Sequence, residues 1–416
     1  MAGQLKINGV TLATEDSSVI TLENPQIKDS SNNLILDQSG SKAVLKNVEV
    51  VNDSPLMFRN KLINGDMRID QRNAGSSVAL SLTAYTLDRW RIQASGLDEA
   101  SLNVSRYSMT ASDLNSTGFS NALRVEVGTA ESAIAADEYV SIQQSIEAQN
   151  LTDLQFGTAN AKSLMLSFWV KTSLTGTYGI TLQKMDTTSR LINKSFTTTS
   201  TDWQQVKIPI AGDTDSGASI VNDNGDGFRL SFWLGVGSDY TSSSSSSWIN
   251  YSDPYWAGSH QQNAFLTTQN ATFYITGVQL EVGNQATPFE HRPYGMELGL
   301  CQRYFELCTL TGRAIHAHYS PNGGLSDAPA FHGFFVPFKQ KKRISPTIPS
   351  VTSDSAWAIL SFANYSAQQP HTFRAQGISV DGFSPVANRI SGNNGPSNGL
   401  VYSWQGTVYY QIDAEL

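Results

Sequence analysis

The chain has 416 residues, a length that suits about three domains and a large hydrophobic core. Its 28 Lys and Arg residues against 36 Asp and Glu residues give a net charge of −8, which argues against a nucleic-acid partner. No apolar run approaches the roughly 20 residues that span a bilayer, and the first residues lack a secretory pattern. We therefore expect neither membrane insertion nor export.

Residues 1–55 contain short apolar runs, such as 19–22 and 34–36, that are separated by turn clusters. Each run is too short to bury a face of a sheet by itself. The segment is either a floppy arm or part of an intertwined trimeric β-structure in which three chains supply the missing neighbours. Ile, Val and Leu recur too regularly for a solvating linker, which favours an extended β arm with inter-chain contacts in a homotrimer.

Residues 56–294 contain many β-patterned runs with turn signals between them. The clearest are residues 123–127, 164–172, 178–183, 205–210, 228–236 and 272–280. This spacing predicts two antiparallel sheets packed face to face. Gly277 inside the last run suggests a β-bulge. In the Phe-Trp pairs at 168–169 and 232–233, one ring should point into the core and the other outward.

A long surface loop is expected at residues 239–260, which are too polar and irregular for a strand pair. Six consecutive serines at 242–247 are followed by four aromatic residues, Trp248, Tyr251, Tyr255 and Trp256. Flat rings provide stacking surfaces for sugars, so this loop is a candidate ligand site. The alternative is that the rings pin the loop onto the sandwich or fill a gap between subunits.

A second polar stretch, between residues 213 and 227, resembles a calcium loop only weakly. The oxygen-bearing residues are Asp213, Asp215, Asn222, Asn224 and Asp226. Trp233 stands where the bidentate Glu of a calcium loop should be. We interpret the stretch as a polar turn.

Residues 295–309 predict a short helical connector, because Leu298, Cys301, Phe305 and Cys308 fall on one helical face. This apolar stripe is expected to make inter-chain contacts. Cysteines seven residues apart on a helix are separated by about 10.5 Å, too far for a disulfide. We expect two buried thiols in a reducing compartment.

Residues 310–416 have brief strands and dense turn clusters, which predict a β-rich tip domain with large loops. Candidate ligand contacts there are Tyr319, Asn322, Trp357, Tyr365, Asn393, Asn394 and Trp404. The cationic cluster Lys339, Lys341, Lys342 and Arg343 is interpreted as a solvated loop or strand edge.

The tip also contains His316 and His318, which share one face if they lie on a strand. Around a three-fold axis, three chains would present six imidazoles to a transition metal. Two half-exposed histidines without a metal are the alternative, because a two-residue motif is weak.

Four motifs, in chain order, resemble the jelly-roll domain found in many bacteriophage tail-fibre and receptor-binding proteins. They are residues 60–67 (NKLINGDM), 88–90 (DRW), 166–172 (LSFWVKT) and 272–294. The resemblance covers residues 57–306 best. The same sandwich is similar to the carbohydrate-binding modules of cellulases and xylanases. Together these likenesses imply an all-β chain with a jelly-roll β-sandwich that binds sugars.

The phage resemblance also implies a place in a virion, assembled in the host cytoplasm. The N-terminal segment would attach to other tail proteins, and the protein would bind host surface polysaccharide without any cofactor. Some phage fibre tips hold a metal on the trimer axis with repeated His-x-His pairs, which His316 and His318 resemble. Host recognition is expected in residues 310–416, with the aromatic loop as the competing surface.

No catalytic motif stands out, neither Gly-x-Ser-x-Gly nor a phosphate-binding loop nor His-Glu-x-x-His, so we expect a binding protein rather than an enzyme. A depolymerase that cleaves glycans with a carboxylate pair is the first alternative. A fibre that decorates the phage head or neck is another. A bacterial carbohydrate-binding protein is a third, disfavoured by the missing export signal.

Overall fold

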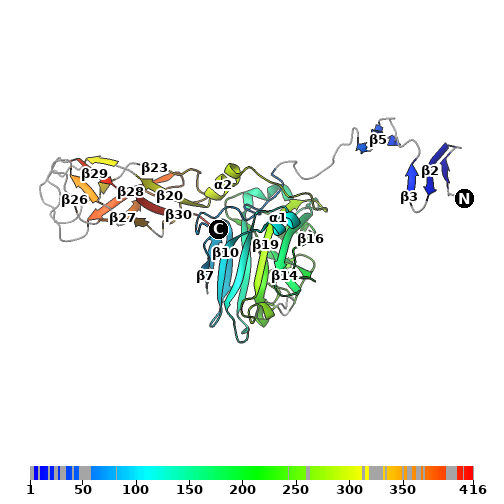
Figure 1. Ribbon diagram of the computed structural model, residues 1–416, viewed down its shortest axis with the longest axis horizontal. Coiled ribbons are helices and arrows are strands. Elements are labelled where there is room, and N and C mark those ends of the chain that lie inside the picture. The colour runs from blue at the N-terminus through cyan, green and yellow to red at the C-terminus, as the bar shows by residue number, and fades with distance from the viewer. Residues whose placement is uncertain are drawn as a thin grey trace. The chain divides into compact units, whose positions relative to one another are not determined.

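The computed structural model describes residues 4–7, 10–16, 19–22, 27–28, 34–39, 42–45, 58–80, 82–241, 243–258, 263–311, 314–317, 331–332, 335–348, 351–353, 358–361, 367–368, 371–389, 401–405 and 407–415 (Figure 1). It describes side chains for residues 58–309, 335–348, 375–384 and 409–415, apart from positions 81, 242, 259–263 and 376. Two compact units are present, Met1–Asp53 and Ser54–Leu416.

The first unit contains two small antiparallel sheets of three strands each. The first sheet consists of β1 (Gln4–Ile7), β2 (Val10–Asp16) and β3 (Val19–Leu22), and the second of β4 (Ile27–Lys28), β5 (Leu34–Ser39) and β6 (Lys42–Leu45). The apolar runs predicted as strands at 19–22 and 34–36 are therefore strands.

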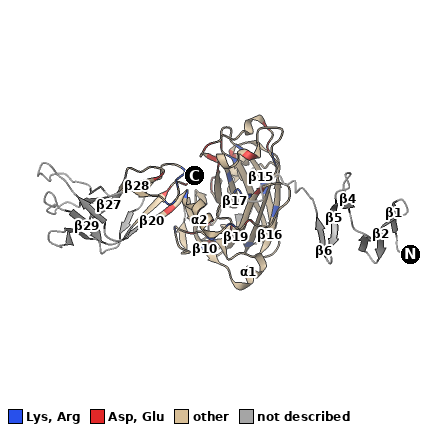
Figure 2. Ribbon diagram, turned by 90° about the horizontal axis from the view of Figure 1, so that it is seen from above, with Lys and Arg blue, Asp and Glu red and all other residues tan. Residues whose placement is uncertain are grey.

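The second unit contains a sandwich of two large antiparallel sheets, which confirms the predicted all-β class. The six-stranded sheet has the order β16-β13-β19-β11-β10-β7, with β7 (Val78–Leu80), β10 (Ser101–Ser108), β11 (Asn121–Thr129), β13 (Leu164–Thr172), β16 (Gln204–Ile210) and β19 (Thr272–Val282). The seven-stranded sheet has the order β18-β15-β14-β17-β12-β9-β8, with β8 (Ala84–Leu87), β9 (Trp90–Ser95), β12 (Tyr139–Glu147), β14 (Gly176–Lys184), β15 (Arg190–Thr198), β17 (Asp226–Val236) and β18 (Ile249–Asn250). Figure 2 shows the two layers from above, with basic and acidic residues interspersed along them.

The core lies between the sheets because apolar residues alternate along the strands. Phe168 of β13 and Phe232 of β17 meet edge to face across the sandwich, with their ring centroids 5.0 Å apart. Trp233, the next residue along β17, belongs to a separate cluster on the other face of its sheet. Trp169 is only half-buried. The prediction that one ring of each pair points inward is confirmed.

Gly277 forms the predicted β-bulge in β19. Ser167 pairs with Gln279 but Trp169 pairs with Thr276, so two residues of β19 oppose the single residue Phe168. Gly277 has a φ of +59°, and a Cβ there would lie 2.5 Å from the Phe119 ring. Both the backbone conformation and the space therefore require glycine.

The helical content of the described residues is low: α1 (Ala111–Thr117), α2 (Tyr294–Gln302) and the 3₁₀ turns Ala148–Asn150, Thr152–Leu154, Ser216–Ala218, Ser238–Tyr240, Asp253–Tyr255 and Asn263–Phe265. Among the described residues, no helix has the length and apolar character to cross a membrane.

The predicted helical stripe from Leu298 to Cys308 is wrong beyond residue 302, where α2 ends. Residues Phe305–Thr311 form strand β20, because their backbone groups pair with β30 (Thr407–Asp413). Phe305 is buried, with the Arg72 guanidinium 3.7 Å from its ring centroid, so it is not available for inter-chain contact. Both cysteines are free, buried thiols, as expected.

The remaining strands make up a smaller C-terminal β region. They are β21 (Ala314–Ala317), β22 (Phe331–His332), β23 (Val336–Pro337), β24 (Val351–Ser353), β25 (Ala358–Ser361), β26 (Ala367–Gln368), β27 (His371–Gln376), β28 (Gly382–Arg389) and β29 (Val401–Gln405). Its small core includes Phe338, Phe383 and Tyr410. Lys342 is 1% exposed and its ammonium lies 2.9 Å from the Glu306 carboxylate, so the cationic cluster is not simply solvated as predicted. Burial of Glu306 requires that cation.

Asn60 joins the segment before β7 to the last strand of the sandwich. Its side chain donates to the Val278 carbonyl and accepts from the Leu280 N–H, both at 3.0 Å. Gly65 lies against the same strand, and a Cβ there would be 2.2 Å from the Val278 oxygen. The glycine of the Asn-Gly-Asp motif is therefore needed for close packing.

Asn64 connects the same segment to β9 and α2. Its side chain donates to the Asp88 carbonyl at 3.0 Å, and its carbonyl accepts from the Trp90 indole at 2.9 Å. Its backbone N–H donates to Glu297 of α2, whose other carboxylate oxygen lies 3.3 Å from the Arg292 guanidinium. The motifs at 60–67, 88–90 and 272–294 thus meet in one buried, hydrogen-bonded hub.

Arg89 carries a second buried contact between the sandwich and the end of β30. It is 1% exposed, donates to the Glu415 carboxylate and the Ser145 carbonyl, and stacks 3.5 Å from the centroid of the Tyr304 ring. Arg72 contacts Glu415 as well, at 3.2 Å. A buried guanidinium needs such partners, because an unpaired charge in the interior is costly.

We predict that Arg89→Met lowers the free energy of unfolding by about 3–5 kcal/mol, because it leaves Glu415 buried with only the Arg72 contact. The double variant Arg89→Met with Glu415→Leu should recover part of that loss. Urea denaturation measures both. Lys207→Met, at an exposed position of β16, is the control and should change little. If the loss of stability in the double variant equals the sum of the losses in Arg89→Met and Glu415→Leu alone, the two side chains are not coupled and the prediction is wrong.

Candidate functional site

The loop between β17 and β19 packs on the outer face of the seven-stranded sheet. On β14, Tyr178, Ile180 and Leu182 point into the core, so Gly179 and Thr181 between them face outward. The Thr181 hydroxyl donates to the Trp256 carbonyl of the loop at 2.6 Å. The sheet surface therefore forms the floor under this loop.

An aromatic cluster covers the middle of this face. The rings of Trp233 and Trp256 lie 5.0 Å apart, and Tyr139 meets the Trp256 ring at 4.9 Å, both edge to face. Each indole N–H is used inside the cluster: Trp233 donates to Thr181 at 2.9 Å and Trp256 to Gln183 at 3.1 Å. Trp256 is 9% exposed, so its ring offers little stacking surface to a ligand.

The four predicted loop aromatics separate into two groups. Tyr251 and Tyr255 are half-buried and pack with Trp256 in the outer cluster. Trp248 instead packs on the main core against Phe156, with ring centroids 5.4 Å apart, and its indole donates to a backbone carbonyl. The rings of Trp248 and Trp256 therefore hold the loop against the sandwich, which is the alternative to a ligand site.

Tyr251 and the residues before it differ from a purely irregular loop. Burial raises the pKa of Tyr251, and its hydrogen bond to Asp253, at 2.6 Å, raises it further.

Residues Ile249–Asn250 form β18, which pairs with β15 through Leu191 and Arg190, so the expectation of no strand pairing is wrong there. The free edge of β15 offers backbone partners that outweigh the polar composition.

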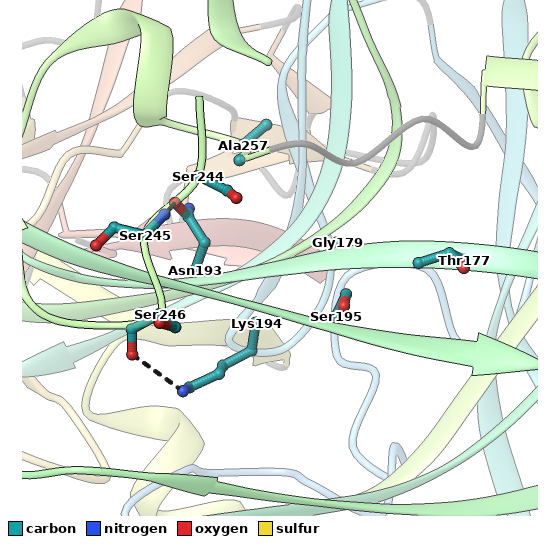
Figure 3. A pocket seen from close by; sticks show the side chains of 10 residues that line it. Thr177, Gly179, Asn193, Lys194, Ser195, Ser244, Ser245, Ser246 and Ala257 are labelled. Atoms are coloured by element: carbon teal, nitrogen blue, oxygen red, sulfur yellow. Dashed lines mark hydrogen bonds between the residues drawn. The ribbon is translucent and has the colours of Figure 1, made fainter. Parts of the chain in front are cut away.

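A cavity of about 350 Å³ lies between β14, β15 and the run of serines (Figure 3). It is lined by Thr177, Gly179, Asn193, Lys194, Ser195, Ser244, Ser245, Ser246, Ala257 and Gly258. None of these residues was predicted as a ligand contact. The available signal was the six serines beside the aromatic residues, together with a glycine at an outward position of a strand.

Asn193 sets the shape of the cavity by holding both of its walls. Its backbone N–H donates to the Ser245 carbonyl at 2.9 Å, and its side-chain oxygen accepts from the Ser245 N–H at 3.0 Å. Its amide donates to the Tyr255 carbonyl at 3.0 Å. Gly258 has a φ of +68°, and a Cβ there would lie 2.9 Å from Asn193 Cγ, so glycine is required beside this anchor.

Lys194 is the charged residue of the cavity lining. Its ammonium donates to the Ser246 carbonyl at 3.3 Å (Figure 3), and burial lowers its pKa. Thr177 and Ser195 add exposed hydroxyls, and the described lining contains no Asp, Glu, His or Cys. The arrangement can hydrogen-bond a hydroxylated ligand and attract an anionic group, but it offers no pair of groups for acid–base catalysis.

The other predicted site residues are not tested by these contacts. His318, Tyr319, Asn322, Trp357, Tyr365, Asn393 and Asn394 lie outside the described residues. His316 is placed on β21 and Trp404 on β29, without a description of their side chains. The histidine metal site and the tip contacts stay predictions.

The polar stretch at 213–227 contains ion pairs. Asp213 is buried and lies 2.5 Å from the Arg190 guanidinium, and Asp226 lies 2.7 Å from Arg229. Each of these two carboxylates is matched by a guanidinium, in line with the interpretation as a polar turn.

No protein-family model and no curated protein matches this chain. Among solved structures, the family 11 carbohydrate-binding module of Clostridium thermocellum, in complex with a mixed-linked tetrasaccharide, is similar at 13% identity and a TM-score of 0.26, over 53% of this chain and all of that one. The CBM22-1 xylan-binding domain of Paenibacillus barcinonensis Xyn10C is similar at 13% identity and a TM-score of 0.25, over 51% of this chain and 99% of that one. Likenesses of this size carry no information about the ligand of this chain.

We predict that Trp256→Ala lowers the free energy of unfolding by about 3–5 kcal/mol, because it empties a buried site and leaves Gln183 without its donor. Tyr255→Ala, at a half-buried position of the same loop, should cost clearly less. Chemical denaturation of both variants measures the difference. Unchanged stability of the Trp256 variant, together with lost glycan binding, would favour the ligand role predicted from sequence.

Proposed function

We propose that this protein binds a glycan in the cavity between β14, β15 and the serine run. The observation that carries the proposal is the lining itself, a cavity of about 350 Å³ with hydroxyl and ammonium groups on its walls. Sugars present many hydroxyls that donate and accept hydrogen bonds, and such a lining matches them. The rigid aromatic cluster beside it keeps the loop wall in position.

The preferred glycan carries an anionic group. Lys194 is partly buried at the wall, and its ammonium donates to the Ser246 backbone carbonyl rather than to a carboxylate. A carboxylate or phosphate on a sugar would supply the missing counter-charge. A protonated ammonium is required, so binding should weaken as the pH rises through the pKa of Lys194.

We propose binding without cleavage. Glycoside hydrolysis generally uses two carboxyl groups on either side of the scissile bond. The described lining of the cavity contains neither Asp nor Glu. A cleaving tail enzyme remains the alternative, and release of oligosaccharide from a bound polysaccharide would favour it.

We further propose that the protein is a virion component that attaches a bacteriophage to host surface glycans, as a tail fibre or receptor-binding protein. The support is the resemblance of residues 60–67, 88–90, 166–172 and 272–294 to such proteins. The N-terminal segment would attach to other tail proteins. Immunogold labelling of virions with an antibody to the chain would test this placement, and labelled heads rather than tails would contradict it.

We predict that Lys194→Gln weakens binding of an acidic polysaccharide about tenfold, which corresponds to about 1.4 kcal/mol, and leaves neutral glycans less affected. A glycan array of bacterial surface polysaccharides, followed by calorimetry on the strongest ligand, measures this. Lys207→Gln is the matched control, because it removes the same charge from an exposed position on the other sheet.

A blocking variant tests the location of the site. Ser195 is exposed on the cavity wall, so Ser195→Trp should fill the cavity and abolish binding while the sandwich stays folded. If this variant still binds, the cavity is not the site and the predicted contacts in residues 310–416 take precedence. Transfer of host range with residues 310–416 in a chimera would support that outcome.

We also propose a homotrimer. The first unit contains sheets of only three short strands, which rarely bury enough surface alone. Multi-angle light scattering of the full-length protein should give three chains per particle. Leu298→Glu, on the half-exposed side of α2, should shift the distribution toward smaller species, whereas Leu82→Glu, which is 71% exposed before the change, should not. One chain per particle for the unaltered protein would rule the trimer out.

A further inference from the structure

Three carboxylates from two loops of the sandwich converge away from the cavity. Asp98 lies between β9 and β10, Glu131 follows β11, and Glu138 precedes β12. One carboxylate oxygen from each lies within 4.8 Å of the other two. Residues that are 40 positions apart in sequence are thus brought to one point by strand pairing in both sheets.

Two of these acids are buried, and no described cation is paired with them. Glu131 and Glu138 are each 2% exposed, whereas Asp98 is exposed and opens the group to solvent. Among the described residues, no Lys, Arg or His forms an ion pair with any of the three. This crowding of negative charge is costly unless something neutralises it.

Glu131 provides an independent observation. Its Oε1 accepts from the Ala100 N–H at 2.9 Å, but its Oε2 is buried and accepts no hydrogen bond. A buried carboxylate oxygen without a partner is rare in folded proteins. Glu138, in comparison, accepts from the Ala135 N–H at 2.7 Å. The unpartnered oxygen therefore marks a position where a further atom is expected.

We propose that Asp98, Glu131 and Glu138 bind a Ca²⁺ ion. Hard oxygen ligands suit Ca²⁺, and the exposed side of Asp98 leaves room for the waters that complete six to eight ligands. Two oxygens bound to one Ca²⁺ at about 2.4 Å lie at most about 4.8 Å apart, which accommodates the observed spacing. For Mg²⁺ the corresponding limit is about 4.2 Å.

The ion would tie together the two loops and the base of the aromatic loop. The backbone of Glu138 accepts from the Gly237 N–H at 2.7 Å, and Ala136 accepts from the Asp239 N–H at 3.0 Å. Both donors belong to the start of the loop that covers the outer face. None of the three acids lines the cavity, but a bound ion would stabilise the segment that leads into the cavity wall.

Calorimetric titration of the full-length, chelator-treated protein with CaCl₂ tests the proposal, together with thermal unfolding in Ca²⁺ and in chelator. We expect one site per chain and a higher unfolding temperature in Ca²⁺. Glu131→Gln and Asp98→Asn should each weaken binding at least about tenfold, because each removes one charged ligand. Asp98 is exposed, so its variant reports on binding even if the Glu131 variant folds poorly.

Asp137→Asn is the matched control, since it removes the same charge from an exposed position of the same loop. Its affinity should stay within about twofold of the unaltered protein. No binding at about 10 mM Ca²⁺, above the range of weak extracellular sites, would overturn the proposal. Equal losses in the Asp137 and Glu131 variants would also overturn it, as would tighter binding of Mg²⁺ than of Ca²⁺.

Discussion

The buried guanidinium of Arg89 constrains the path of the chain far beyond its own strand. Burial lowers the pKa of Arg89, but the Glu415 carboxylate raises it well above the usual range, so the charge persists inside the protein. The chain leaves the sandwich at Phe305, and it must return there so that Glu415 reaches Arg89. The pairing of Phe305 with Asp413 brings the outgoing and returning strands side by side. The C-terminal β region is thus closed at its base by the ion pairs of Glu415 with Arg89 and Arg72 and by the pairing of β20 with β30.

The hub and the cavity use separate parts of the same sandwich. The hub draws on residues 60–66, 88–90 and 278–297, whereas the cavity draws on β14, β15 and the loop after β17. They share no residue, so changes in the cavity lining leave the hydrogen bonds of the hub in place. Recognition loops on a rigid scaffold commonly vary in this way. The aromatic cluster supports the cavity indirectly, because it holds the loop in place but forms little of the cavity wall.

Features with a local period could be predicted from the sequence, and features that depend on distant partners could not. Alternation of apolar residues gave the strands at 164–172 and 228–236, and glycine in a strand gave the bulge at Gly277. The predicted helix runs past Gln302, where the real one ends, because the partner strand of Phe305–Thr311 lies about a hundred residues later in the chain. The cavity depends on bonds between Asn193 and Ser245, which are 52 residues apart. No pattern within either segment indicates that pairing.

The partners of buried acidic residues elsewhere in the chain support the proposed Ca²⁺ site around Glu131. Glu297 faces Arg292, and Glu147 faces Arg303 at 2.7 Å. Asp88 has no ion pair, but both of its oxygens accept hydrogen bonds from Gln71. At these positions the fold supplies either a cation or a donor for each buried carboxylate. Among the described residues, Glu131 Oε2 has neither, and two more carboxylates lie beside it. A cation from solution supplies what the side chains do not, because it interacts with all three charges at once.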